Sequence, residues 1–177
     1  MTPQSIRLIP RIALFSAIIY IFSWATSFLL NVSLIFFIVF SCGYMWGFIP
    51  GMITGAVGMG LTTLFNPYGP AMPPIMIVQI LGTMFSGVVG AFSYKYLNQN
   101  KNKLSVVLIL ISASLVCTIA YFLPLNIVDA WLFQPFWERF IVGSLWSLVS
   151  VASNIVIFTL LYPLLISFYE KERRLVC

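Results

Sequence analysis

The sequence alternates between apolar stretches and short polar or proline-rich breaks. The apolar stretches have the composition of membrane-spanning helices. We expect six spans, at residues 12–30, 34–49, 52–65, 75–94, 104–123 and 138–162. The weak break at Asn31-Val32-Ser33 is required, because a helix from 12 to 49 would be about 57 Å long, whereas a bilayer core is about 30 Å thick.

Proline, glycine and polar residues mark the remaining breaks. Pro50-Gly51 predicts a turn between the second and third spans. We expect loops at residues 66–74, 95–103 and 124–137. Pro163 predicts a kink at the end of the sixth span, and residues 170–174 are expected to form a soluble tail.

The basic residues predict the orientation. With both chain ends in the cytoplasm, eight basic residues lie inside and one, Arg139, lies outside. The inside set is Arg7, Arg11, Lys95, Lys101, Lys103, Lys171, Arg173 and Arg174. If Pro50 only kinked one long helix, the balance would become three inside to six outside. The positive-inside rule therefore favours six spans with cytoplasmic N- and C-termini.

Composition supports this fold class. Apolar residues make up 61% of the 177 residues and charged residues 7%, against about 25% charged residues in soluble domains. We therefore expect a single all-α integral membrane domain over residues 1–177, multi-pass in the cell membrane and surrounded by membrane lipid. Ser23-Trp24-Ala25 is similar to a signal-peptidase site, but the apolar run continues, so we expect the first helix to be retained. The net charge of +5 does not predict nucleic-acid binding, because the basic residues lie at the ends of spans.

Several kinds of chemistry are disfavoured. The chain has no histidine, and its cysteines, Cys42, Cys117 and Cys177, have no metal-site or redox spacing. We therefore expect no catalytic residues, no cofactor and no metal site. No acidic residue lies deep in the interior of a predicted span, which disfavours a proton-driven carrier.

Small residues recur at intervals of four. Gly43, Gly47, Gly51 and Gly55 form one series, and such faces usually pack helices against each other within one bundle. Gly82, Ser86 and Gly90 form another. Ala13 and Ala17 lie at the cytoplasmic end of the first span, and their spacing leaves both internal packing and partner docking open.

Polar and aromatic residues gather on the predicted outer side. They are Asn66, Tyr68, Trp131, Gln134, Trp137, Glu138 and Arg139. An interfacial aromatic belt explains the aromatic residues, but Glu138 and Arg139 also indicate an ion pair or a ligand contact. Gln79 in the fourth span and a polar stripe in the sixth predict that these two helices line one outward-facing pocket. That stripe includes Arg139, Gly143, Trp146, Ser147, Ser150 and Asn154. Hydrogen bonds between helices are the alternative explanation.

The chain resembles an S component in three features. It has six helices with both ends inside, the sequence Ala13-x-x-x-Ala17 on the first helix, and glycine-rich second, third and fourth helices. An S component is the substrate-binding membrane subunit of an energy-coupling factor (ECF) transporter. The resemblance implies that Ala13 and Ala17 contact a transmembrane coupling subunit, that two ATPase subunits drive import, and that the S component reorients in the membrane. It also implies an outward-facing binding site for a vitamin or related micronutrient. The candidate residues that would bind this substrate are the polar and aromatic residues of the outer side together with Gln79, Trp146, Ser150 and Asn154. The connection after the first helix is shorter than in many members, and the N-terminal histidine of the nickel and cobalt members is missing.

The sequence leaves other functions open. A non-transporting membrane scaffold, such as the small multi-span subunit of the rod-shape cell-wall machinery, also has short glycine-rich helices. A lipid-modifying enzyme lacks the necessary acid, base or metal ligands. The substrate itself is not determined: the tryptophans suit a planar ring, Glu138 suits a cation, and Arg139 suits a carboxylate or phosphate.

Overall fold

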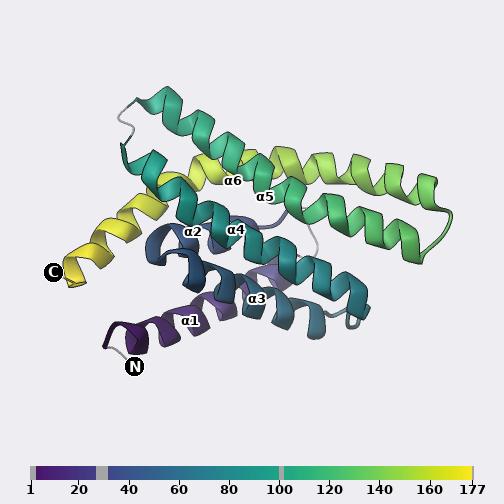
Figure 1. The fold of residues 1–177 in the computed structure, drawn as a ribbon, viewed down its shortest axis with the longest axis horizontal. Coiled ribbons are helices and arrows are strands. Elements are labelled where there is room, and N and C mark those ends of the chain that lie inside the picture. Colours follow the sequence, from purple (N-terminus) through teal and green to yellow (C-terminus); the bar gives the residue numbers. More distant parts are fainter. Residues whose placement is uncertain (1–2, 27–31, 100–101, 177) are drawn as a thin grey trace.

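The computed structural model is an all-helical bundle (Figure 1). It describes residues 3–26, 32–99 and 102–176. The helices are α1 (Pro3–Thr26), α2 (Ile35–Trp46), α3 (Phe48–Leu64), α4 (Pro73–Gln99), α5 (Lys103–Leu132) and α6 (Phe136–Val176). The end of the predicted first span at 27–30, Asn31 of the predicted break, Lys101 and Cys177 lie outside the described residues.

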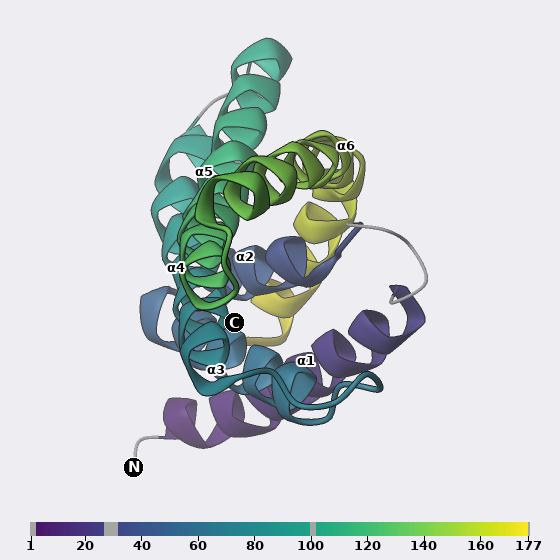
Figure 2. The ribbon, with the colours of Figure 1, turned by 90° about the vertical axis from the view of Figure 1, so that its right-hand side faces the viewer.

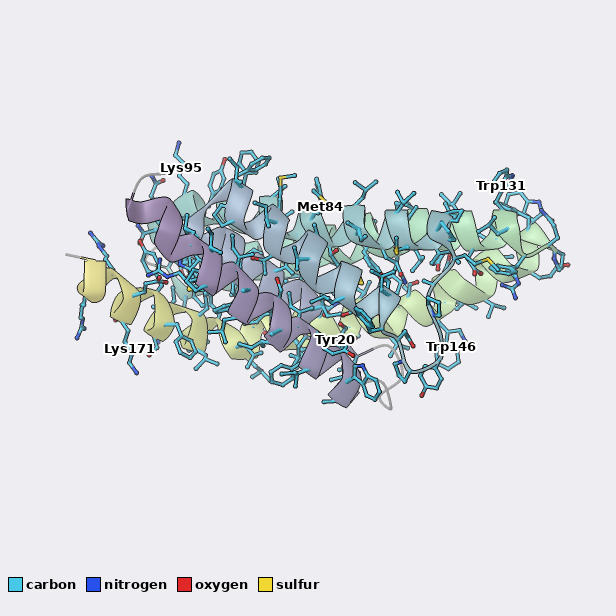
Figure 3. The ribbon with its side chains drawn as sticks, turned by 90° about the horizontal axis from the view of Figure 1, so that it is seen from below. Tyr20, Met84, Lys95, Trp131, Trp146 and Lys171 are labelled. Carbon is cyan, nitrogen blue, oxygen red and sulfur yellow. The ribbon has the colours of Figure 1, made fainter. Side chains whose placement is uncertain are left out.

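The helices run back and forth along one long axis. The start of α1, the end of α6 and the connection between α4 and α5 lie at one end of the bundle (Figure 1). The connections between α3 and α4 and between α5 and α6 lie at the other end. Lys95 and Lys171 lie at the first end and Trp131 at the second (Figure 3). This arrangement agrees with the positive-inside prediction, so we call the first end cytoplasmic and the second end outer.

The short helix α2 is the core of the bundle. It packs against each of the other helices, and Figure 2 shows it in the middle of them. Nine of its 12 residues are buried, among them Phe36 and Phe40. Twelve residues span only about 18 Å, so α2 does not cross a bilayer core of about 30 Å alone. Four helices, α1, α4, α5 and α6, are long and apolar enough to cross it, whereas α2 and α3 are shorter.

The turn between α2 and α3 lies at Gly47, three residues before the predicted Pro50-Gly51 turn. Gly47 has φ +90°, a left-handed conformation that favours glycine. Pro50 lies instead in the first turn of α3. Backbone N–H groups in a first turn have no hydrogen-bond acceptor within the helix, so proline is tolerated there. The predicted turn between the second and third spans is therefore present, but Gly47 makes it rather than Pro50-Gly51.

The glycine series packs helices α2, α3 and α4 together. A Cβ on Gly51 would lie 2.7 Å from the Cα of Gly43, and a Cβ on Gly87 would overlap the backbone of Gly51. A Cβ on Gly90 would likewise overlap the backbone carbonyl of Phe40. These helices therefore approach backbone to backbone, which confirms internal packing for Gly43, Gly51 and Gly90, whereas Gly47 has no neighbour at its Cβ position and makes the turn.

Three helices continue into predicted breaks. Helix α4 runs to Gln99, so the first part of the loop predicted at 95–103 is helical. Helix α5 passes through Pro124 to Leu132, so most of the predicted loop at 124–137 is helical. Helix α6 continues through Pro163 to Val176, so the predicted soluble tail is also part of a helix. Figure 1 shows α6 changing direction in its yellow half, where Pro163 removes one backbone hydrogen bond.

Candidate functional site

The cavity that we call the Gln79 cavity opens between four helices at the outer side of the core. It has a volume of about 300 Å³, at the lower end of the range for small-molecule sites. Its lining residues are Val32, Ser33, Ile35, Phe36, Met59, Gln79, Tyr121, Phe122 and Leu125. The lining is mainly apolar and aromatic, with a few polar groups that can orient a ligand.

Gln79 provides the carboxamide of this cavity. It lies in the second turn of α4, and its Oε1 atom is buried without a hydrogen-bond partner in the described structure. Gly82, three residues later on the same face of α4, allows α5 to come close: a Cβ there would lie 2.9 Å from the Cα of Tyr121. This close approach explains how Gln79 and Tyr121 come to line the same cavity.

Three aromatic rings form one wall of the Gln79 cavity. The centroids of Phe36 and Tyr121 are 5.0 Å apart, and those of Tyr121 and Phe122 are 4.9 Å apart, both with edge-to-face geometry. Such packing fixes the ring positions. The cavity therefore combines a rigid aromatic wall with one unsatisfied hydrogen-bond acceptor, which suits a planar ligand that carries a polar edge.

A second cavity, which we call the hydroxyl cavity, lies next to the first at the outer end of α1 and α3. Its volume is about 270 Å³. It is lined by Ser23, Trp24, Thr26, Ser33, Thr62, Asn66, Pro67 and Tyr68. Ser33 lines both cavities. Of the predicted site residues, the hydroxyl cavity thus contains Asn66 and Tyr68, and the Gln79 cavity contains Gln79.

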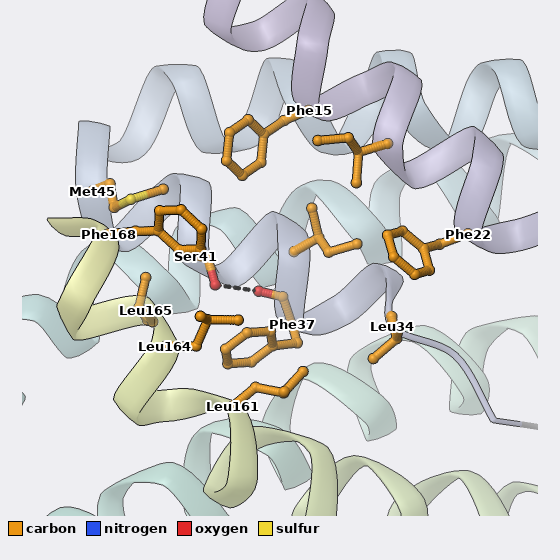
Figure 4. A pocket seen from close by; sticks show the side chains of 12 residues that line it. Phe15, Phe22, Leu34, Phe37, Ser41, Met45, Leu161, Leu164, Leu165 and Phe168 are labelled. Carbon is orange, nitrogen blue, oxygen red and sulfur yellow. Dashed lines mark hydrogen bonds between the residues drawn. The ribbon is translucent and has the colours of Figure 1, made fainter. Parts of the chain in front are cut away.

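A third cavity is unsuited to a water-soluble ligand. It lies between α1, α2 and α6, has a volume of about 260 Å³, and is lined by apolar side chains apart from Ser41 (Figure 4). The Ser41 hydroxyl donates to the carbonyl oxygen of Phe37 at 2.7 Å. The Ser41 oxygen can still accept a hydrogen bond, but the side chains that line this cavity leave no free donor for the polar part of a vitamin.

The polar stripe of α6 faces α5. Asn154 Nδ2 donates to Thr118 Oγ1 at 3.0 Å, and Asn126 Nδ2 on α5 donates to Ser147 Oγ at 2.9 Å. Asn154 and Ser150 are both buried. The interhelical hydrogen bonds considered as an alternative are therefore present.

The pocket predicted between the fourth and sixth helices needs correction. Tyr94 of α4 and Tyr169 of α6 share a hydrogen bond of 2.8 Å toward the cytoplasmic end, but at the level of Gln79 the helices that line the cavity with α4 are α2, α3 and α5. Gln79 therefore shares its cavity with α2, α3 and α5. Trp146 lies on α6, is about half exposed, and lines none of the three cavities described.

The remaining predicted site residues lie at the outer tip formed by α5 and α6. Trp131 and Trp137 are 70% and 68% exposed, as expected for an interfacial aromatic belt. Gln134 Oε1 accepts from the backbone N–H of Phe136 at 3.0 Å. The tip extends along the bundle axis beyond the α3–α4 connection (Figure 1). These residues therefore lie away from the Gln79 cavity.

The predicted ion pair at this tip has a different acidic partner. Arg139 Nη1 lies 3.0 Å from Asp129 Oδ2, and the Arg139 guanidinium lies over the Phe133 ring at 4.8 Å from its centroid. Glu138 is exposed beside them. The salt bridge therefore connects the last turn of α5 to the first turn of α6.

Ala13 and Ala17 lie on the exposed side of α1. Both are exposed, as is Leu14 between them. The opposite side of α1 carries the buried residues Ser16 and Ile19, and Ile19 packs against Gly58 of α3. Within the described residues, the alanine spacing is therefore not used for packing inside this chain.

A family model for the S component of ECF-type riboflavin transporters matches residues 3–171. The chain belongs to this family. No curated protein and no solved structure gives a significant match. The family assignment confirms the predicted six-helix membrane fold and multi-pass location. The S component is thus a substrate-binding transport subunit rather than an enzyme, and it works with an ECF module in the uptake of a riboflavin-like substrate.

Most of the S component's aromatic cavity wall was not predicted from the sequence. Phe36, Tyr121 and Phe122 occur in apolar runs, where the sequence alone does not separate cavity residues from core residues. One feature of the sequence indicated a site at Gln79. Gly82 follows it by three residues on the same helix face, so a neighbouring helix can approach the backbone closely next to the Gln79 side chain. Asp129 was also missed as the partner of Arg139, because its segment was expected to be a loop.

Proposed function

We propose that the S component binds riboflavin with its flavin ring in the Gln79 cavity and its imide edge on the Gln79 carboxamide. The observation that carries this proposal is the buried, unpartnered Oε1 atom of Gln79. A buried acceptor left unsatisfied costs about 1–3 kcal/mol, so a ligand N–H at this position is favoured.

The chemistry of the flavin ring fits this group. Its imide edge has an N–H between two carbonyl oxygens, and a carboxamide offers one carbonyl acceptor beside an NH₂ donor. The imide N–H can therefore donate to Gln79 Oε1, while the Gln79 side chain also has a hydrogen bond with Tyr121. The aromatic wall of Phe36, Tyr121 and Phe122 supports the planar ring by apolar and ring–ring contact.

We further propose that the exposed face of α1 around Ala13 and Ala17 binds the transmembrane coupling subunit. Small exposed residues four apart let another helix come close to the backbone in a bilayer. Two ATPase subunits then supply the energy for release inside, and membrane lipid surrounds the remaining apolar surface. The S component itself reorients to deliver the vitamin.

The substrate proposal is tested by titrating riboflavin into the detergent-purified S component and following quenching of flavin fluorescence. Gln79→Ala is expected to weaken binding about tenfold to a hundredfold, because the ring edge loses its partner. Gln99→Ala is the matched control, since Gln99 is exposed at the cytoplasmic end of the same helix. Equal affinities for the wild type and Gln79→Ala would contradict the proposal.

A further inference from the structure

The cavity between α1, α2 and α6, which we call the apolar cavity, opens sideways between α1 and α6 (Figure 4). Phe15 and Phe22 of α1 and Leu161, Leu164 and Phe168 of α6 are among its lining residues. Leu164 and Phe168 are about half exposed, and the backbones of α1 and α6 do not come close to each other within the described residues. Because these helices span the membrane, the opening faces the hydrocarbon core of the bilayer.

The chemistry of the lining determines what can fill the apolar cavity. Among the described residues that line it, Ser41 alone has a polar side chain, and its hydroxyl already donates to the Phe37 carbonyl. Apolar cavities do not hold water, and an empty cavity costs its walls their dispersion contacts. Acyl chains are the apolar material that the bilayer supplies at such an opening. A hydrocarbon chain therefore fits the cavity.

The depth of the apolar cavity matches one leaflet of the bilayer. Leu161 and Lys171 are ten residues apart on α6, which corresponds to about 15 Å along a helix. One leaflet contributes half of a bilayer core that is about 30 Å thick. On α1, Arg11 precedes the lining residue Phe15 by one turn. The cavity therefore extends from the charged cytoplasmic end of the bundle to about the middle of the membrane.

Two cations and one carboxylate lie at the cytoplasmic end of the apolar cavity. Glu172 follows Phe168 by one turn, and its two carboxylate oxygens lie 2.6 Å from Arg11 Nη2 and 2.7 Å from Trp46 Nε1. The Arg11 guanidinium has five N–H donors, so it can bind a phosphate as well as Glu172. Lys171 is exposed and follows Phe168 by three residues on the same side of α6. This surplus of positive charge matches the headgroup of an anionic lipid in the cytoplasmic leaflet.

We propose that the apolar cavity is a binding site for one anionic phospholipid of the cytoplasmic leaflet. One acyl chain lies between α1 and α6, and the phosphate lies near Arg11 and Lys171. This lipid site is separate from the proposed vitamin site, because none of the residues described as lining it lines the Gln79 cavity or the hydroxyl cavity. The lipid fills the space between α1 and α6, while the Ala13 and Ala17 side of α1 stays exposed.

Native mass spectrometry of the full-length S component tests this site. The detergent-purified protein is mixed with equal amounts of phosphatidylglycerol and phosphatidylcholine that carry the same acyl chains. Leu164→Trp enlarges a side chain at the opening, and Leu160→Trp is its control, because Leu160 is exposed one turn earlier and does not line the cavity. Lys171→Gln removes a cation, and Lys95→Gln is its control, since Lys95 is exposed on α4 at the same end.

We expect the wild type to retain one lipid molecule and to prefer phosphatidylglycerol about tenfold. Leu164→Trp should retain about tenfold less lipid, because its ring takes the place of the acyl chain, whereas Leu160→Trp should retain lipid like the wild type. Lys171→Gln should lower the preference for phosphatidylglycerol about fivefold, and Lys95→Gln should leave it unchanged.

Equal lipid retention by the two tryptophan variants, or equal retention of the two lipids by the wild type, would overturn the proposal. A preference for phosphatidylglycerol that Lys171→Gln leaves unchanged would also overturn it, and this comparison does not depend on the folding of Leu164→Trp. So would a lipid-free dimer of the wild type that Leu164→Trp dissociates, because a second copy of the chain would then fill the cavity.

Discussion

Arg11 of α1 and Glu172 of α6 form an ion pair that connects these two helices at the cytoplasmic end. Arg11 Nη2 lies 2.6 Å from Glu172 Oε1, although the backbones of α1 and α6 do not come close to each other within the described residues. Trp46 completes the cluster, because its Nε1 donates to Glu172 Oε2 at 2.7 Å and its ring lies near the Arg11 guanidinium. The apolar cavity of Figure 4 separates the same helices farther along their length.

This cluster is expected to fix the position of α1 at the cytoplasmic end. We predict that Arg11→Gln and Glu172→Gln each lower the thermal unfolding midpoint of the detergent-purified protein. The double variant should lose less than the sum of the two, with a coupling energy of up to about 1 kcal/mol. Glu170→Gln is the control, because Glu170 is exposed two residues away. Strictly additive effects would show that the pair contributes no coupling.

The glycine contacts predict unequal tolerance of alanine. At Gly87 an added methyl group meets the Gly51 backbone, which cannot move aside as a side chain can. Gly87→Ala is therefore expected to destabilise the protein by about 1–3 kcal/mol or more. At Gly60 the nearest atom lies 4.0 Å from an added Cβ, so Gly60→Ala should be neutral or slightly stabilising. The measurement is the unfolding midpoint in detergent, and equal effects of both variants would disprove the proposed backbone contact.

The exposed alanine face predicts a separation of binding from transport. Ala13→Trp combined with Ala17→Trp should abolish riboflavin uptake, because bulky rings prevent a partner helix from approaching. Riboflavin binding by the purified protein should persist, since both residues point away from the bundle core. Leu160→Trp on α6 is the control, because Leu160 is 71% exposed.

Uptake is measured in cells that express the S component with a coupling subunit and two ATPases. An equal loss of binding and uptake in the alanine variant would assign this face to internal stability. Normal uptake would place the docking surface elsewhere.

The sequence predicted the fold through its apolar stretches and charges. The six helices, their back-and-forth order and their orientation follow from apolar length and from the basic residues at one end. Helix ends were less accurate, because prolines were interpreted as breaks. Pro124 and Pro163 lie inside helices that continue through them, as neighbouring helices allow in a membrane.

The site was predictable only in part. Gln79 stands out as a polar residue in an apolar span, and such residues usually face the bundle interior. Asn154 carries the same signal but bonds to Thr118 across the α5–α6 interface. Periodicity identifies the face of a helix, not which neighbour covers it, so the sequence could not separate a cavity residue from an interhelical hydrogen bond.

The most direct test of the central claim compares riboflavin with a derivative methylated on the imide nitrogen. Both are titrated into the wild-type S component, and flavin fluorescence gives the dissociation constants. The methyl group removes the one N–H that Gln79 Oε1 is proposed to accept, so we predict about tenfold to hundredfold weaker binding of the derivative. Equal affinity for the two flavins would contradict the placement of the ring edge on Gln79.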